Sequence, residues 1–157
     1  MKIAFLGTHG VGKTTLCYEL AAALKRLDLS VDLVKEVARR CPLPINRQTT
    51  AQAQRWILHT QIADEIMLEP FYDVIVSDRA VLDNYAYLVQ AAGRQPDLEP
   101  AIVNWLGTYS LLVKVPVLEA PRFDGTRDVS QAFQMQVDQR LDALLAEFGL
   151  EPLQLSR

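Results

Sequence analysis

A short run of residues near the start of the chain constrains its fold more than any other feature. The sequence GTHGVGKT, Gly7–Thr14, matches the pattern G-x-x-x-x-G-K-[ST] at every fixed position, after an apolar run and before a helix-like segment. Small residues let the backbone wrap around a phosphate with its N–H groups pointing inward, and the start of the following helix adds a partial positive charge. The motif predicts a buried strand, a phosphate-binding loop and a helix, in that order.

The side chains of this loop predict what kind of phosphate it binds. Lys13 can bridge the outer phosphates of a nucleoside triphosphate, and the hydroxyl of Thr14 can ligate Mg²⁺. A glycine turn that only connects a strand to a helix would require neither side chain. We therefore expect the cofactors to be ATP, as the preferred triphosphate, and Mg²⁺. The residues expected to contact the nucleotide belong to the loop and to the first turn of the helix: Gly7, His9, Gly10, Val11, Gly12, Lys13, Thr14 and Thr15.

The rest of the chain alternates between apolar runs typical of buried strands and segments with helical periodicity. This alternation predicts a single α/β domain, 1–157, with a parallel sheet covered by helices on both faces. Ligands of such sheets bind beyond the carboxyl ends of the strands. The expected strands are 2–7, 31–36, 73–78, 109–117 and 151–156, and the expected helices are 13–27, 49–69, 80–93, 95–107 and 130–148.

An acidic residue and an arginine end one of these apolar runs. Asp78 would lie at the tip of a buried strand beside the phosphate loop, where a carboxylate can hold Mg²⁺ through a water molecule. Arg79 would then reach a phosphate or a substrate oxygen with its fork of donors. The alternative is that Asp78 caps the next helix and that Arg79 is solvated. For Asp78 the two interpretations are compatible.

A second acid ends the strand expected at 31–36. Glu36 would face the acceptor side of a bound triphosphate, where it can accept a proton from a substrate hydroxyl or orient that hydroxyl. Arg39 and Arg40 follow within one turn and can bind a polar part of the acceptor. The alternative is a solvated pair of Glu36 and Arg40 at i, i+4, which is common on helices.

A loop at about 118–130 carries Arg122 and Arg127 around an Asp-Gly pair. In enzymes that transfer phosphoryl groups, mobile arginines neutralise charge on the transferring group, and a glycine permits such movement. We expect this loop to form a short lid, the alternative being an exposed charged loop with no catalytic role.

The composition makes several classes of function less suitable. The 157 residues have a formal charge of −3 and no basic stripe, so nucleic acid is not the expected partner. No apolar run approaches the roughly 18–20 residues that cross a bilayer, so no membrane association is expected. The two cysteines, Cys17 and Cys41, predict reduced thiols in a cytoplasmic protein rather than a disulfide framework.

Four segments resemble those of small P-loop kinases and occur in the same order: GTHGVGKTTL, EVARR, SDRAVLDNYAY and DGTR. The chain looks like a member of the AAA-domain-like family that includes the ribosylnicotinamide kinase domain of bifunctional NAD regulators. It is more distantly similar to thymidylate kinases and deoxynucleoside kinases. The resemblance spans residues 2–155. It departs from these kinases at Ala80, where deoxynucleoside kinases have serine and thymidylate kinases an aromatic residue, and in its short lid.

The resemblance implies a three-layer P-loop fold with a five-stranded parallel sheet in the order 2-3-1-4-5. It implies an ATP- and Mg²⁺-dependent phosphotransferase whose acceptor is a nucleoside, a nucleotide or a similar small molecule. A homodimer is left open. The catalytic residues that it implies are Lys13, Glu36, Asp78, Arg79, Arg122 and Arg127, with Thr14 and Asp78 as metal ligands.

In such a fold the helix expected at 49–69 would line the acceptor pocket. An aromatic side chain there can stack on a base, and the amide of Gln54 can hydrogen-bond to the edge of a base. The predicted apolar stripe of this helix consists of Ala53, Trp56, Ile57, Ala63 and Met67. Because Trp56 lies on this stripe, we favour a place in the core for it, and we expect His59 at the surface.

Two other functions are left open by the sequence. A P-loop ATPase that acts as a regulatory switch would hydrolyse ATP slowly and would have no acceptor pocket. A kinase that acts on nucleic-acid ends or modified bases would need a basic surface, which the sequence does not predict.

Overall fold

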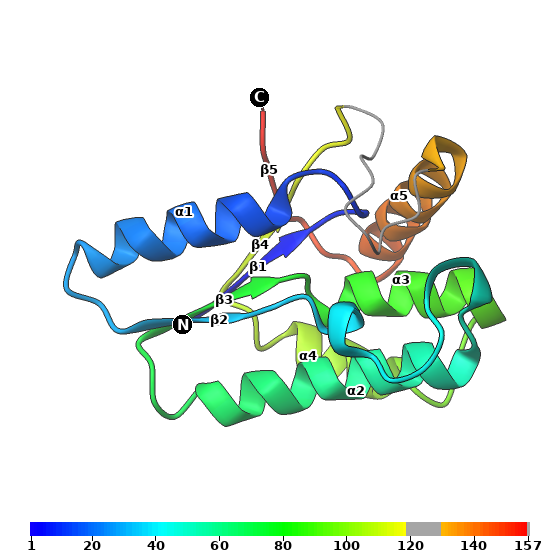
Figure 1. Ribbon diagram of the computed structural model, residues 1–157, viewed down its shortest axis with the longest axis horizontal. Coiled ribbons are helices and arrows are strands. Elements are labelled where there is room, and N and C mark those ends of the chain that lie inside the picture. Colours follow the sequence, from blue (N-terminus) through cyan, green and yellow to red (C-terminus); the bar gives the residue numbers. More distant parts are fainter. Residues whose placement is uncertain (119–129, 157) are drawn as a thin grey trace.

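The computed structural model describes residues 1–118 and 130–156, which form a parallel sheet with helices on both faces (Figure 1). The strands lie in the order β2-β3-β1-β4-β5, and every neighbouring pair is parallel. The predicted topology is therefore confirmed. The strands are β1 Lys2–Leu6, β2 Val31–Val34, β3 Val74–Asp78, β4 Leu111–Lys114 and β5 Leu153–Gln154.

The helices agree with the expected segments, although two short 3-10 helices were not predicted. Strand β2 ends at Val34 rather than at residue 36, because the backbone turns at Glu36 to begin one of these 3-10 helices. In the described part of the chain, no helix has both the length and the hydrophobicity needed to cross a membrane. The helices are α1 Lys13–Lys25, η1 Val37–Arg40, η2 Asn46–Gln48, α2 Ala51–Leu68, α3 Val81–Ala92, α4 Glu99–Leu106 and α5 Gln131–Glu147.

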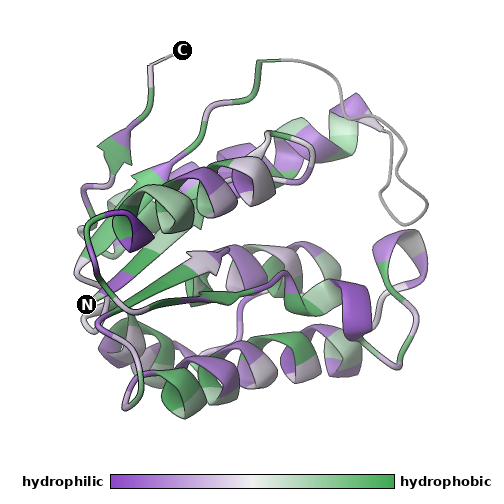
Figure 2. Cartoon of the chain, turned by 60° about the vertical axis from the view of Figure 1, so that its left-hand side comes forward, coloured by the Kyte–Doolittle hydropathy of each residue, from purple (hydrophilic) through white to green (hydrophobic). Residues whose placement is uncertain are grey.

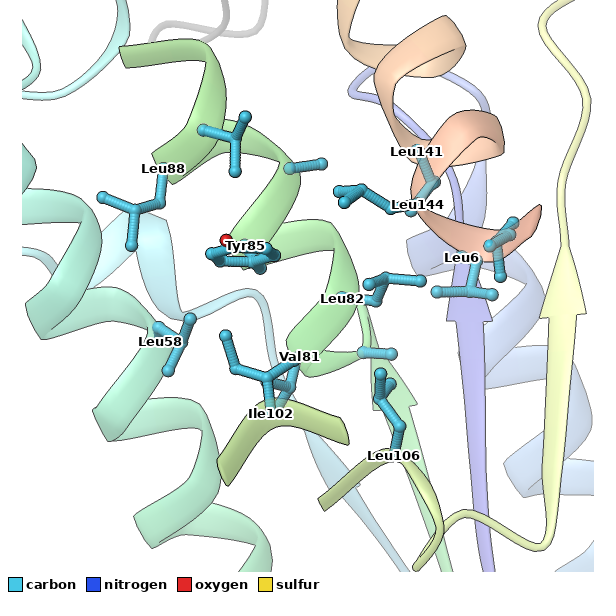
Figure 3. Packing of buried hydrophobic residues seen from close by; sticks show 14 of the residues in the cluster. Leu6, Leu58, Val81, Leu82, Tyr85, Leu88, Ile102, Leu106, Leu141 and Leu144 are labelled. Carbon is cyan, nitrogen blue, oxygen red and sulfur yellow. The ribbon is translucent and has the colours of Figure 1, made fainter. Parts of the chain in front are cut away.

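The central strand β1 is buried along its whole length, and its side chains alternate between two hydrophobic clusters. Ile3 and Phe5 pack on the face covered by α1, whereas Ala4 and Leu6 pack on the face covered by α2 to α5. Figure 3 shows Leu6 facing the leucines of α3 and α5. Figure 2 shows hydrophobic strands between the two helical layers, as expected for a parallel sheet buried on both faces.

The register of the sheet brings three segments to one edge. Phe5 of β1 pairs with Asp78 of β3, so the carboxyl end of β3 lies beside the loop that follows β1. Val34 of β2 pairs with Ser77 of β3, so Glu36 comes to the same edge two residues later. The candidate site therefore lies where parallel sheets of this kind bind their ligands.

The predicted apolar stripe of α2 is wrong in its second half. Ala63 and Met67 are exposed, and Trp56 is only partly buried. The buried face of α2 instead consists of Ala53, Gln54, Ile57, Leu58, Gln61 and Glu65. The hydrophobic pattern fails here because polar side chains with hydrogen-bond partners can occupy core positions.

Candidate active site

The phosphate loop connects β1 to α1, and its first glycine cannot be replaced by a larger residue without strain. Gly7 has a φ of 146°, which side chains rarely tolerate. A Cβ atom at this position would lie 2.9 Å from the carbonyl oxygen of Val115, which follows β4. The backbone of the loop therefore packs directly against the neighbouring strand, as an enclosed phosphate-binding turn requires.

Lys13 folds back over this loop. Its Nζ donates to the carbonyl oxygens of Gly7, at 2.7 Å, and of Thr8, at 2.5 Å. Burial lowers the pKa of Lys13 from 10.5 to about 8, and the charge of Arg79 adds to this effect. The ammonium group thus lies inside the loop, where the outer phosphates of a nucleotide would meet it.

Thr14 and Asp78 meet beside the loop. The Thr14 hydroxyl donates to Oδ2 of Asp78 at 2.5 Å. These two oxygens are hard ligands of the kind that Mg²⁺ prefers, and Mg²⁺ usually binds through one or two protein groups together with water and substrate phosphates. In the described residues, no group of three or more His, Cys, Asp or Glu side chains could hold a metal ion. One hydroxyl and one carboxylate fit a magnesium ion whose other ligands would be water and phosphate oxygens.

The alternative in which Asp78 caps the helix after β3 is wrong, because the Asp78 carboxylate accepts from Thr14 and the helix begins after Ala80. Ala80 is the N-cap residue of α3, and its N–H donates to Oδ2 of Asp83 at 2.9 Å. Oδ1 of Asp83 accepts the N–H of Gly7 at 2.8 Å. Burial raises the pKa of Asp83 above its ordinary value. This carboxyl group therefore joins the start of the phosphate loop to the start of α3.

Glu36 lies between two arginines. Its Oε1 accepts from Nη2 of Arg79 at 2.7 Å and from Nε of the same residue at 3.1 Å. Its Oε2 accepts from Nε of Arg39 at 2.9 Å. Burial alone would raise the pKa of Glu36, but the charges of Arg79 and Lys13 outweigh burial and hold this pKa at about 2, below its ordinary 4.5. Glu36 is therefore an anion with a fixed orientation.

Two interpretations left open by the sequence are wrong in this region. Arg79 is not solvated, since only 4% of its surface is exposed. Arg40 does not pair with Glu36, because it forms an ion pair with Asp64 of α2. The i, i+4 spacing did not predict the pairing because η1 is a single 3-10 turn and not an α-helix.

The backbone of Arg79 is strained. Its φ is 109°, a conformation that costs a residue other than glycine on the order of 1–3 kcal/mol. The guanidinium lies over the ring of Tyr87, 4.9 Å from its centroid, as well as beside Glu36. Strain of this kind persists only where surrounding contacts hold it, and it is concentrated at functional sites.

A pocket of about 250 Å³ opens beside this pair of charges. One wall is His9 of the phosphate loop, and the others come from the segment after β2, from α2, from α3 and from the start of α5. The lining residues are His9, Glu36, Ala38, Arg39, Ile45, Asn46, Thr49, Gln54, Ile57, Arg79, Asn84, Tyr87, Gln90, Ala91 and Phe133. The pocket is thus continuous with the phosphate loop and is mixed in polarity.

Aromatic and amide groups shape this pocket. The rings of His9, Tyr87 and Phe133 lie 5.9 to 6.4 Å apart, and the Tyr87 hydroxyl lies 2.8 Å from Nδ1 of His9. Two buried donors at the pocket wall, Nη1 of Arg79 and Nδ2 of Asn84, have no hydrogen-bond partner among the described residues. A ligand in the pocket that carries acceptor atoms can satisfy both donors.

The predicted site residues are only partly brought together. Lys13, Thr14, Glu36, Asp78 and Arg79 lie around the phosphate loop and the pocket. Arg122 and Arg127 lie outside the described residues. Trp56 and His59 do not line the pocket, and His59 is exposed with Nδ1 2.7 Å from the Arg55 carbonyl oxygen.

Sequence reasoning missed most of the pocket wall, including Asn84, Tyr87 and Phe133. Asn84 and Tyr87 lie on α3, and Phe133 lies on α5. A signal existed for α3, since Asn84, Tyr87 and Ala91 have the i, i+3, i+7 spacing of one helical face. No comparable signal links Phe133 to the site, because only the packing of α5 on α3 brings it there.

The sheet order and the loop between β1 and α1 together define a P-loop fold, which implies that the chain binds a nucleotide. The sequence matches the AAA domain family over residues 2–157, and the chain belongs to that family. None of the curated proteins is a significant match.

Solved structures of deoxyadenosine kinase from M. mycoides are similar to the chain. The structure with bound dATP has a TM-score of 0.65 and 16% sequence identity, and the match covers 99% of this chain and 91% of that one. The structure with the products dCMP and a flexible dCDP has the same score and identity, with 99% and 88% covered. At this level of identity the likeness shows a shared fold. It confirms the expected P-loop fold.

Proposed function

We propose that the chain is an ATP- and Mg²⁺-dependent phosphotransferase that moves the γ-phosphoryl group to a nucleoside, a nucleotide or a similar small acceptor. The observation that carries this proposal is the pocket of about 250 Å³ that connects the phosphate loop to the Glu36–Arg79 pair. A switch ATPase has no need of a second pocket beside the γ-phosphate. The volume of the pocket and its enclosure by several elements suit a small molecule.

The phosphate side of the reaction belongs to the loop. Lys13 would leave the carbonyl oxygens that it now contacts and bind the outer phosphates, while Thr14 and Asp78 would hold Mg²⁺. When bound, Mg²⁺ neutralises charge on the phosphates. Arg79 would add a second cation at the acceptor side, where its Nη1, which has no partner among the described residues, can meet an oxygen of the acceptor or of the transferring group.

The acceptor oxygen would attack the γ-phosphorus as the bond from that phosphorus to the β–γ bridging oxygen breaks, and ADP would leave. Glu36 would orient the acceptor hydroxyl and receive its proton late in the transfer. A carboxyl group with a pKa of about 2 is a weak base, so orientation is its larger contribution. This suits phosphoryl transfer, in which most catalysis comes from positioning and charge neutralisation.

The pocket wall supports a nucleoside-like acceptor. Tyr87 and Phe133 offer aromatic surface, and Gln54 and Asn84 offer amides that can bind the edge of a base. The structurally similar deoxyadenosine kinase gives a second reason to begin with deoxynucleosides. The lid role of Arg122 and Arg127 stays a prediction. The assignment of the chain to one domain also stays a prediction.

The test is an assay of ADP formation with ATP and Mg²⁺ against nucleosides, deoxynucleosides, their monophosphates and nicotinamide riboside. We expect ADP formation to rise strongly with one acceptor and an equal amount of phosphorylated product to appear by mass spectrometry. The Lys13→Ala variant, purified in the same way, measures the ADP formed by contaminating kinases. Slow hydrolysis that no acceptor accelerates would contradict the proposal and favour a switch ATPase.

A further inference from the structure

Side chains from distant parts of the chain bind the backbone just after β3. Nε2 of Gln61, on α2, donates to the carbonyl oxygen of Arg79 at 3.1 Å. The hydroxyl of Tyr109, which precedes β4, accepts the N–H of Val81 at 3.0 Å. The N–H of Ala80, the residue between Arg79 and Val81, donates to Oδ2 of Asp83. The strained turn is therefore fixed at three consecutive residues.

A single buried carboxylate orients both of the distant side chains. Oε1 of Glu65 lies 2.8 Å from Nε2 of Gln61 and 2.8 Å from the hydroxyl of Tyr109, and both groups donate to it. Oε2 of Glu65 accepts from Nε1 of Trp105 at 2.7 Å and lies 3.1 Å from Nζ of Lys2. Glu65 has no exposed surface. Its partners therefore have little freedom to take other orientations.

Gln61, Glu65 and Tyr109 do not line the pocket, whereas Arg79 does. Gln61 and Tyr109 can therefore affect the pocket only by fixing the backbone at Arg79 and Val81. The guanidinium of Arg79 reaches Glu36 with two donors, and this geometry depends on where the backbone points.

We propose that Gln61 and Tyr109, both oriented by Glu65, are positioning residues that hold Arg79 in its strained conformation and so aim its guanidinium at Glu36 and the pocket. The positioning itself is a property of the fold. Its consequence for turnover rests on the proposed function.

The first test measures positioning without turnover. Hydrogen exchange of the Arg79 Nε–H is followed by ¹⁵N NMR in the wild type and in the Gln61→Met and Tyr109→Phe variants. Each substitution removes one hydrogen-bonding group and retains a side chain of similar shape. Because the bond from this N–H to Glu36 should loosen, we expect exchange to become about tenfold faster or more in both variants.

Trp105→Phe is the matched control. It removes a hydrogen bond to the same carboxylate, through the oxygen that does not hold Gln61 or Tyr109. We expect near wild-type exchange at Arg79 in this variant, with thermal unfolding confirming that all three variants are folded. Unchanged exchange in both Gln61→Met and Tyr109→Phe would overturn the proposal. So would equally fast exchange in Trp105→Phe, since it would indicate general loosening.

The second test uses the acceptor found in the ADP assay. We expect Gln61→Met to raise KM for the acceptor and lower kcat, with KM for ATP unchanged, and to have no further effect in an Arg79→Lys background. Full additivity of the two substitutions would overturn the positioning role. The NMR test needs neither an acceptor nor turnover, so its result stands if the proposed function fails.

Discussion

The hydroxyl of Thr14 donates to Oδ2 of Asp78 at 2.5 Å, which joins the first turn of α1 to the last residue of β3. These positions are 64 residues apart in the chain, yet the pairing of β1 with β3 places them side by side. The two side chains can therefore share one small cation without rearrangement of the sheet.

We expect Asp78→Asn to weaken the dependence on Mg²⁺. The amide retains one oxygen but loses the charge, so the apparent affinity for Mg²⁺ should fall by roughly tenfold or more. A titration of ATP turnover with Mg²⁺ measures this, and Asp142→Asn, at an exposed carboxylate of α5, is the control. The same Mg²⁺ requirement in Asp78→Asn as in the wild type would remove Asp78 from the metal site.

We expect Lys13→Ala to abolish transfer, lowering kcat by roughly a hundredfold or more, because it removes the cation nearest the outer phosphates. Lys25→Ala, at an exposed residue in the last turn of the same helix, should leave the rate near that of the wild type. Both rates come from the coupled ADP assay. Turnover by Lys13→Ala at the wild-type level would contradict the phosphate-loop mechanism.

We expect Glu36→Gln to lower kcat more than it lowers the affinity for ATP. The amide cannot hold Arg79 and Arg39 as the carboxylate does, and it cannot accept the acceptor proton. Steady-state kinetics with the identified acceptor, together with calorimetry of ATP binding, separate the two effects. Equal losses in both quantities would assign Glu36 a structural role only.

The same residue gives a prediction for stability. The pKa of Glu36 is about 2 in the folded chain and returns toward 4.5 on unfolding, so the unfolded chain binds more protons between these values. The contribution of Glu36 to the free energy of unfolding is therefore fully present above about pH 4.5 and is lost as the pH falls toward 2.

Urea unfolding at about pH 6 and about pH 3 tests this. We expect the free energy of unfolding to fall less between these pH values in Glu36→Gln than in the wild type, because the variant has no carboxyl group to protonate at that site. Equal falls in the two proteins would show that Arg79 does not stabilise the charged form of Glu36.

Much of the fold could be predicted because its signals are local. The motif at Gly7–Thr14 specifies a strand, a loop and a helix within a few residues, and the doubly buried strand β3 begins with three consecutive apolar residues. The predictions fail where polar residues are buried. Gln61 and Glu65 occupy core positions of α2 because they have partners on other elements, and no hydrophobic pattern records such partners.

The site was predictable in its phosphate-binding half and less so in its acceptor half. Lys13 and Thr14 are fixed by spacing within one motif, whereas Arg79, one of the two arginines that bind Glu36, lies 43 residues away after another strand. Asn84 and Tyr87 have helical spacing but no chemical signature. Phe133 joins the pocket only through the packing of helices, which sequence alone does not specify.

The pocket and the phosphate loop use largely separate parts of the chain, and this separation has a consequence for how such proteins can diversify. Gln54, Ile57, Asn84 and Tyr87 form part of the pocket wall on α2 and α3, while the phosphate loop connects β1 to α1. Under the proposed function, we expect exchanges at Gln54, Ile57 and Asn84 to alter which acceptor is used without touching the loop, whereas an exchange at Tyr87 would disturb the loop, because its hydroxyl accepts the N–H of His9. In a kinase built this way, acceptor preference and nucleotide binding would be separable properties, since the three helix positions and the loop lie on different elements.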